Sequence, residues 1–322
     1  MDKKRFFYKT VIKATPFFMA LFYLFMLTWQ SDHVAVTDDA RFYFEAAESY
    51  AEYFEKGFDG FHFFEKSFID RHWRKNNEHP PAAKLLMASG YMLHKHSGFM
   101  KKHVSFRVGI SILASLLILF IFSFVKHAFS FRAAIFSSLF FIFFPRVFFH
   151  ARVATLDFTV GAFSFIFVYA YWRGFNSRLW AWMTGPVFGL ALASKLNAPF
   201  MAVAVLFHYC FVNRGFILKK PWKIFTASQF VSMLIFSLPV FFMIWPWMWY
   251  DTVQRMMNYI SFHLNHYGIL MYYLGEIYSE PPPPWHAPLV KTVFTVPAVS
   301  VLCVLFSPFV YPRYKEKQNN SA

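Results

Sequence analysis

Charged residues are scarce in this 322-residue sequence, and acidic residues are the scarcest. Asp, Glu, Lys and Arg together make up 15% of the chain, against about 25% in a soluble globular domain. Only 17 residues are acidic, against 32 Lys and Arg, which gives a net charge of +15. Hydrophobic residues make up 57% of the chain, and 47 residues are Phe. This composition excludes an ordinary soluble domain and indicates a membrane protein.

Cysteine is almost missing as well. Cys210 and Cys303 are the only two, and both lie inside apolar runs. Two such residues exclude a disulfide framework, and a metal site would need more ligands near them. We interpret both as small buried hydrophobic residues.

Long apolar runs are what the sequence has in place of charge. The first follows a basic N-terminus and is similar to a signal peptide, but no small-residue cleavage site follows Trp29, so we expect an uncleaved helix. A helix that spans a membrane needs roughly 17 to 25 mostly apolar residues. The runs that qualify or nearly do are 11–30, 104–125, 131–149, 155–172, 179–194, 197–212, 224–248 and 289–311. The sequence therefore predicts an all-α polytopic membrane protein with about eight transmembrane helices in a single domain over 1–322.

The distribution of charge predicts the orientation. With the N-terminus inside, the inner segments are basic, as the positive-inside bias requires. Their only acidic residues are Asp2 and Glu316, so the other acidic residues fall on the outer face. That face receives 31–103 as the first outer loop and 250–288 as the last, and 312–322 becomes a cytoplasmic tail. The short apolar run 82–94 is then an interfacial helix, because counting it as a span would reverse every later loop.

The first outer loop begins with two adjacent acids. Asp38 and Asp39 lie where the first span ends, and such a pair at a membrane boundary is costly unless it is hydrated or used. One of them could also cap the following helix. The acidic residues that come next recur at helical spacing, opposite an apolar face, and we interpret them as the solvated side of an interfacial helix. They are Glu45, Glu48, Glu52 and Glu55.

Three further outer segments carry polar residues. "NNEHPPAAK" (76–84) has two prolines, "FPRVFFHARVATLD" (144–157) has Arg146, Arg152 and Asp157, and "GLALASKLNAP" (189–199) has Lys195. Each has an ordinary explanation: a kinked loop, arginines that reach the interface, and a lysine at a helix end. The topology nevertheless brings all three to the face that carries Asp38 and Asp39.

The order of these segments resembles the GT-C superfamily of membrane glycosyltransferases that use polyprenyl-phosphate sugars. The similarity is greatest to the branch of protein O-mannosyltransferases and the lipid A aminoarabinose transferase. It rests on "DDARF" (38–42), "EHPPAAKLLMASGYML" (78–93), "SFRVGISILASLL" (105–117), "ARVATLDFTVGAF" (151–163) and "GLALASK" (189–195). The segment "HLNHYGILMYYLGEIYSEPPPPWHAPLV" (263–290) is similar to the last outer loop of the family. Relatives usually have eleven or more spans.

The resemblance implies an inverting transferase that moves a hexosyl or pentosyl group. Asp38 aligns with the catalytic acid that serves as base or acceptor anchor, beside Asp39, and Asp157 with the second acid. The implied phosphate-binding residues are Arg41, His79, Lys84, Arg107 and Lys195, because Arg and Lys bind phosphate through charge-assisted bonds. Glu78, His266 and Glu276 are expected to bind substrate.

The resemblance also implies the partners and the location. The donor is a polyprenyl-phosphate sugar, the acceptor is a lipid, glycan or protein, and no nucleic acid is involved. No cofactor is certain, although a divalent cation stays open, since Glu78 either holds one or orients His79. The expected location is the bacterial inner membrane, with the active site on its outer face.

Two other readings stay open on the sequence. The outer acids and cations could bind the solute of a polytopic transporter, although a transporter usually places its site near the midplane. The chain could also be a catalytically inactive membrane subunit.

Overall fold

The computed structural model describes residues 3–60, 62–217, 227–265, 270–279 and 282–307. The chain forms two compact units, residues 1–264 and 265–322. The elements of the first unit are α1 (Lys3–Ser31), α2 (Asp38–Gly60), η1 (His62–Phe64), α3 (Lys66–Trp73), α4 (Ala82–Ser97), α5 (Lys102–Ala128), α6 (Phe131–Ile142), α7 (Pro145–Val153), α8 (Leu156–Arg173), α9 (Arg178–Leu192), α10 (Pro199–Val212), α11 (Arg214–Ile217), α12 (Ser228–Met243), η3 (Pro246–Trp249) and α13 (Thr252–Leu264). The prediction of a mostly helical membrane protein is confirmed.

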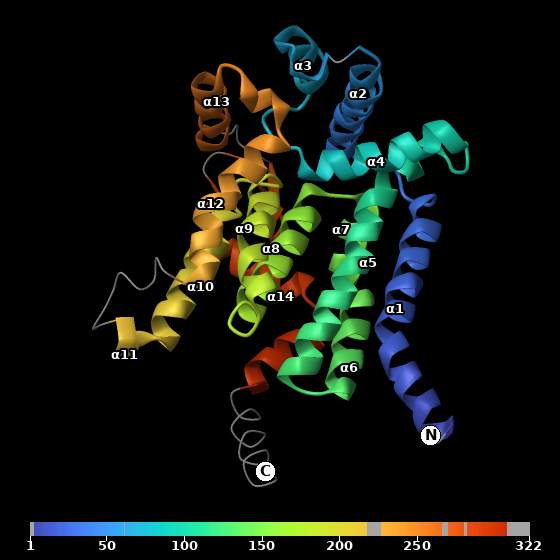
Figure 1. Cartoon of the computed structure of the whole chain (residues 1–322), viewed down its shortest axis with the longest axis vertical. Helices are drawn as coiled ribbons and strands as arrows, with labels where there is room; N and C mark the ends of the chain where they lie inside the picture. The colour runs from blue at the N-terminus through green and yellow to red at the C-terminus, as the bar shows by residue number, and fades with distance from the viewer. Residues whose placement is uncertain (1–2, 61, 218–226, 266–269, 280–281, 308–322) are drawn as a thin grey trace. The chain divides into compact units, whose positions relative to one another are not determined.

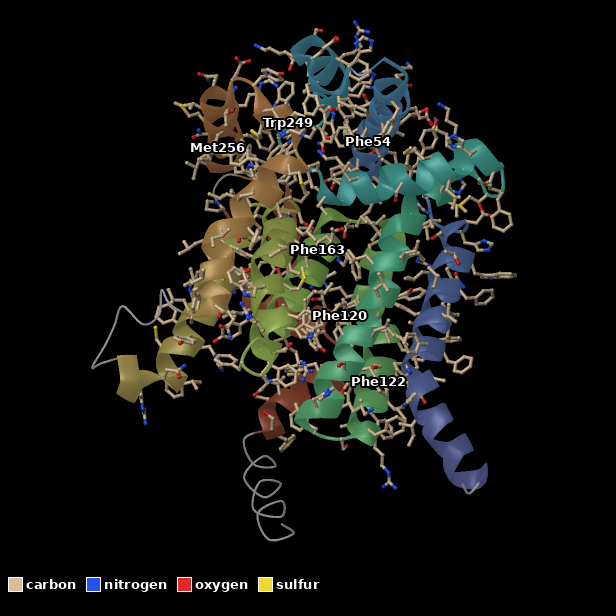
Figure 2. The ribbon with its side chains drawn as sticks, viewed as in Figure 1. Phe54, Phe120, Phe122, Phe163, Trp249 and Met256 are labelled. Carbon is tan, nitrogen blue, oxygen red and sulfur yellow. The ribbon has the colours of Figure 1, made fainter. Side chains whose placement is uncertain are left out.

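The longer helices of the first unit run side by side, and α2, α3, α4 and α13 lie together at one end of them (Figure 1). In Figure 2, Phe54 and Trp249 lie at this end, and Phe120 and Phe122 lie toward the other. Arg255 of α13 joins two of the end elements, because its guanidinium donates to Asp70 of α3 at 2.6 Å. We call this end of the first unit, with α2, α3, α4 and α13, the loop end.

Glycine allows the closest helix contacts. A Cβ at Gly109 of α5 would lie 1.9 Å from the carbonyl oxygen of Leu86 in α4, and one at Gly185 of α9 would lie 2.1 Å from that of Ser232 in α12. Ser232 Oγ also accepts a bond from the Gly185 amide at 3.0 Å. Small residues let helix backbones approach in this way in membrane proteins.

Two helices of the described chain are long and apolar enough to cross a membrane, Ile12–Ser31 and Lys102–Ala128. Two bent helix pairs would raise the number to four. Several of the predicted spans are shorter helices here, among them α10 and α12, so the number eight stays a prediction.

The predicted span 131–149 is two helices. α6 and α7 are inclined by 59° to each other. Phe144 is extended (ψ 110°) and Pro145 begins α7. Proline disfavours the helical conformation in the residue before it and cannot donate a backbone bond to the preceding turn. The bend therefore follows from "FFPRV".

Of the four glutamates predicted as the solvated face of α2, Glu45 is exposed as expected, whereas Glu48 and Glu55 bond to other helices. Glu48 accepts bonds from Lys102 at 2.8 Å and from Tyr91 at 2.9 Å, and Glu55 accepts one from Lys95. Helix α2 is therefore held to α4 and α5 through its acidic side, while Phe44, Ala47 and Ala51 are buried as expected.

The second unit is small. It contains the strands β1 (Met271–Tyr273) and β2 (Glu276–Tyr278), which pair antiparallel with Tyr272 opposite Ile277, then α14 (Ala287–Thr295) and a helix over Ala298–Ser307 inclined by 108° to α14. The described part of the predicted span 289–311 falls on these two helices, and 308–311 lie outside the described residues.

Candidate functional site

The two adjacent aspartates lie in the first turn of α2. The Ala40 amide donates to the Thr37 side chain at 3.3 Å, so the Thr37 hydroxyl caps an amide of the first turn of α2. Asp38 and Asp39 are both exposed. Their negative charges are stabilised by the helix dipole at this position.

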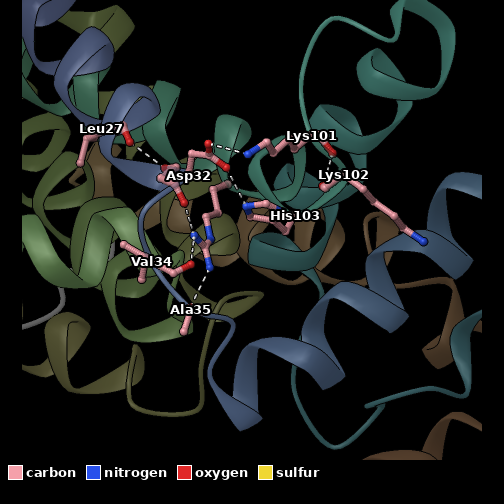
Figure 3. Close-up of polar contacts among 10 residues, drawn as sticks. Leu27, Asp32, Val34, Ala35, Lys101, Lys102 and His103 are labelled. Atoms are coloured by element: carbon pink, nitrogen blue, oxygen red, sulfur yellow. Dashed lines mark hydrogen bonds and ion pairs between the residues drawn. The ribbon is translucent and has the colours of Figure 1, made fainter.

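Arg107 holds the segment that leads to these aspartates. It is fully buried in α5, and its guanidinium donates to the carbonyl oxygens of Ser31 at 2.5 Å, Val34 at 3.0 Å and Ala35 at 3.0 Å. Figure 3 shows the bonds to this segment beside the ion pairs of Asp32 with Lys101 and His103. Arg107 therefore anchors the connection from α1 to α2, a use of its donors that differs from the predicted contact with phosphate.

The turn before α4 brings His79 close to Lys195. Ala82, the first residue of α4, donates its amide to the carbonyl oxygen of Ala193 at 2.8 Å. This bond ties the His-Pro-Pro turn to the segment that follows α9, which carries Lys195. Two segments more than 100 residues apart in the sequence thus meet at the loop end.

Asp157 is positioned by the sharp connection between α7 and α8. Ala154 is left-handed (φ 62°) and ends α7, and Thr155 caps α8 by accepting a bond from the Phe158 amide at 3.2 Å. Asp157 then lies in the first turn of α8, where Lys195 Nζ is 2.5 Å from its Oδ1. The two side chains are 61% and 31% exposed, so water screens the pair and leaves it open to exchange partners.

These residues surround a polar cavity of about 80 Å³, which we call the acid cavity. Its lining includes Asp39, His79, Asp157 and Lys195, together with Thr37, Ala40, Tyr43 and 153–156. Four of the site residues predicted from the sequence, taken from four separate segments, therefore meet. Of the adjacent aspartates, the one that lines this cavity is Asp39.

A second cavity, of about 840 Å³, lies among α5, α6, α7 and α8; we call it the apolar groove. Its lining is mostly apolar, with Leu117, Ile121, Ser137, Phe140, Phe141, Phe144, Val147, Phe158, Gly161, Ala162 and Phe165. Arg146, His150 and Asp157 complete it. Asp157 is thus common to the groove and the acid cavity. Arg146 and His150 are one turn apart on α7. Their spacing is visible in the sequence, but only the structure shows that both line the groove.

The other predicted site residues lie elsewhere. Arg41 is exposed, over the ring of Phe42. Glu78 accepts a bond from Asn76 at 2.7 Å, and Lys84 is fully buried and bound to carbonyl oxygens of the same turn. Glu276 belongs to the second unit, where it accepts a bond from Tyr278 at 2.7 Å. His266 lies outside the described residues.

A cation site is not evident at Glu78. Within the described ranges, no three His, Cys, Asp or Glu side chains come together in a way that could hold a metal ion. The described residues around Glu78 therefore do not offer the ligand set that a divalent cation requires.

The helical fold, with a polar cavity and an apolar groove that share Asp157, is that of a membrane protein with room for an amphipathic ligand. Residues 78–247, more than half of the chain, match the family described as dolichyl-phosphate-mannose-protein mannosyltransferase, and the chain belongs to this family. It is thus an integral membrane glycosyltransferase of the GT-C type, as the resemblance implied. The matched segment contains His79, Asp157 and Lys195, and the aspartates of α2 precede it. No curated protein and no solved structure matches the sequence.

Proposed function

We propose that this protein transfers a sugar from a polyprenyl-phosphate donor to a hydroxyl or amine acceptor at the outer face of the membrane, with its N-terminus in the cytoplasm of a bacterial cell. The observation that supports this most is the position of Asp157, which lines both the apolar groove and the acid cavity. A lipid-linked sugar needs such a pair of spaces side by side, one apolar and one polar.

The groove suits the lipid part of the donor. Its volume of about 840 Å³ is within the range of small-molecule sites, about 300–1,000 Å³, and could accept the first isoprene units of a polyprenyl chain. Arg146 and His150 lie at the same groove as Asp157, and Lys195 is paired with Asp157. In the proposal Arg146 and Lys195 bind the phosphate by charge-assisted bonds, and His150 donates a hydrogen bond to it through its ring N–H.

The acid cavity suits the transfer. The acceptor oxygen or nitrogen attacks the anomeric carbon, its proton moves to a carboxylate, and the bond from that carbon to the phosphate oxygen breaks. The polyprenyl phosphate leaves with the electron pair as a stable anion, so that one base suffices. A single displacement inverts the anomeric carbon. The lining of the cavity favours Asp39 as this base, whereas the sequence pattern assigned the base to Asp38; Asp157 orients the acceptor.

In this proposal the remaining predicted residues contact the substrates from outside the lining of the acid cavity. Arg41 is two residues after Asp39, and Glu78 precedes His79, and both Asp39 and His79 line the cavity. In the proposal Arg41 and Glu78 contact the sugar or the phosphate. Glu276 and His266 of the last outer loop would contact a lipid, glycan or protein acceptor.

The groove can be tested through the length of the donor's lipid. A Cβ at Gly161 would meet no atom within 4 Å, so Gly161→Phe places a ring in the groove without forcing the helices apart. We expect the variant to lose transfer from a long-chain polyprenyl-phosphate mannose at least tenfold and to keep most transfer from a donor with one or two isoprene units. Gly161→Ala is the matched control and should use both donors normally. Equal losses with both donors would contradict the assignment of the groove.

A further inference from the structure

Lys84 is a buried cation with an unusual set of partners. It is the third residue of α4, fully buried, and its ammonium lies 5.7 Å from the centre of the Tyr50 ring. Its Nζ donates to the Asn76 carbonyl oxygen at 2.5 Å, to Asn76 Oδ1 at 3.1 Å and to the His79 carbonyl oxygen at 2.8 Å. An ammonium has three N–H donors, so these three acceptors use all of them. A phosphate would find neither a free donor nor an exposed surface on this side chain.

The acceptors all belong to one short turn. Asn76 is left-handed (φ 51°), and its side chain also donates to Glu78. The His79 amide closes the turn on the Asn76 carbonyl at 3.4 Å. Beyond His79, Pro80 and Pro81 provide no amide donor, so the turn has few backbone bonds of its own. The Lys84 ammonium therefore adds three hydrogen bonds that fix its shape.

A buried charge at this position is costly, and its bonds must offset that cost. Burial lowers the pKa of Lys84 to about 7, although Glu78 opposes this, so the three bonds to Asn76 and His79 are what favour the charged form. An apolar side chain of similar length could fill the same space, but it would leave the Asn76 and His79 oxygens without their donor. The turn that Lys84 binds ends at His79, and His79 lines the acid cavity.

We propose that Lys84 is a positioning residue that fixes the Asn76–His79 turn, and that it acts on sugar transfer only through His79. The inference rests on the proposed function, because the His79 side chain is taken to contact the donor in the acid cavity. It replaces the direct phosphate contact that the sequence suggested for Lys84.

A double-mutant cycle in the full-length protein tests this. His79→Ala, Lys84→Met and the double variant are compared in transfer from polyprenyl-phosphate mannose. We expect Lys84→Met to lower transfer at least tenfold in the wild-type background, in the same parameter, kcat or KM, that His79→Ala changes. In the His79→Ala background the same substitution should change transfer less than twofold. An equal factor in both backgrounds, normal transfer by Lys84→Met or normal transfer by His79→Ala would each overturn the proposal.

Hydrogen exchange separates this inference from the proposed function. In the peptide over 74–82, Lys84→Met should raise the exchange rate at least tenfold, and Lys95→Met, a lysine of the same helix paired with Glu55, should leave it unchanged. We expect this difference in exchange rate even if the wild-type protein transfers no sugar. Such a lack of transfer would refute the proposed function but not the role of Lys84 in the turn. Unchanged exchange in Lys84→Met would overturn the inference alone.

A milder variant covers the case in which Lys84→Met does not fold. Asn76→Gly keeps a residue that tolerates the left-handed conformation and removes only the Oδ1 acceptor and the bond to Glu78. We expect a smaller increase in exchange and a smaller loss of transfer, the latter again absent in the His79→Ala background. Wild-type exchange and transfer in Asn76→Gly would contradict the proposal.

Discussion

The clearest energetic prediction concerns Arg107, the buried cation that anchors the segment before α2. In Arg107→Met, the carbonyl oxygens of Ser31, Val34 and Ala35 lose their donors. A bond to a charged group contributes about 1.5–3 kcal/mol, so three of them set an upper value of roughly 5–9 kcal/mol. Removing the cost of burying the charge offsets part of this. We expect a net loss of about 3 kcal/mol in the free energy of unfolding, or roughly 6–10 °C in the midpoint of thermal unfolding.

The assay is thermal unfolding of the purified protein in detergent, with sugar transfer measured in parallel. Arg107→Lys keeps the charge but cannot reach three carbonyls with a planar fork, so it should fall between wild type and Arg107→Met. Arg132→Met is the matched control, since Arg132 is an exposed arginine of α6, and it should unfold like wild type. Transfer should fall in Arg107→Met even below its unfolding temperature, because Asp39 is no longer held. If Arg107→Met unfolds at the wild-type temperature, the anchoring role is refuted.

Two further predictions concern stability. Gly109→Ala should lower the free energy of unfolding by about 2 kcal/mol or more, because its Cβ would lie 1.9 Å from the Leu86 carbonyl oxygen. Gly161→Ala is the control, since its Cβ would have open space, and it should unfold like wild type. Equal unfolding of the two variants would contradict the close packing of α4 on α5. Burial raises the pKa of Glu48, but the bonds from Lys102 and Tyr91 outweigh it and hold the pKa below its usual range. A carboxyl whose pKa is lowered by folding stabilises the protein above the unfolded pKa of about 4.3 and loses that contribution as the pH falls through the folded value. The unfolding temperature of wild type should therefore drop more between pH 7 and pH 3 than that of Glu48→Gln, and equal drops would argue against the ion pair.

Part of the site could be predicted from the sequence because polar residues are so rare in it. Asp39, His79, Asp157 and Lys195 are conspicuous among apolar neighbours, and membrane topology alone assigns their segments to one face. Their meeting around one cavity agrees with that assignment.

The uses of the buried cations could not be predicted. A sequence motif does not distinguish a lysine or arginine that faces a ligand from one that binds backbone carbonyls, because the carbonyls come from segments that only the fold brings near. Lys84 and Arg107 are both of this second kind. The place of the groove could not be predicted for a similar reason: the run 131–149 is mostly apolar, and the bend at Pro145 that brings Arg146 and His150 to the groove depends on the three-dimensional arrangement.

If sugar is transferred at the acid cavity, the carboxylates that line this cavity are required for transfer. The purified protein is incubated with radiolabelled polyprenyl-phosphate mannose and extracted membranes, and label in the acceptor fraction is compared for wild type, Asp38→Asn, Asp39→Asn and Asp157→Asn. We expect wild type to transfer label to the acceptor fraction. Asp39→Asn and Asp157→Asn should lower this transfer at least a hundredfold, and Asp38→Asn should lower it less. Undiminished transfer by Asp39→Asn and Asp157→Asn would contradict it.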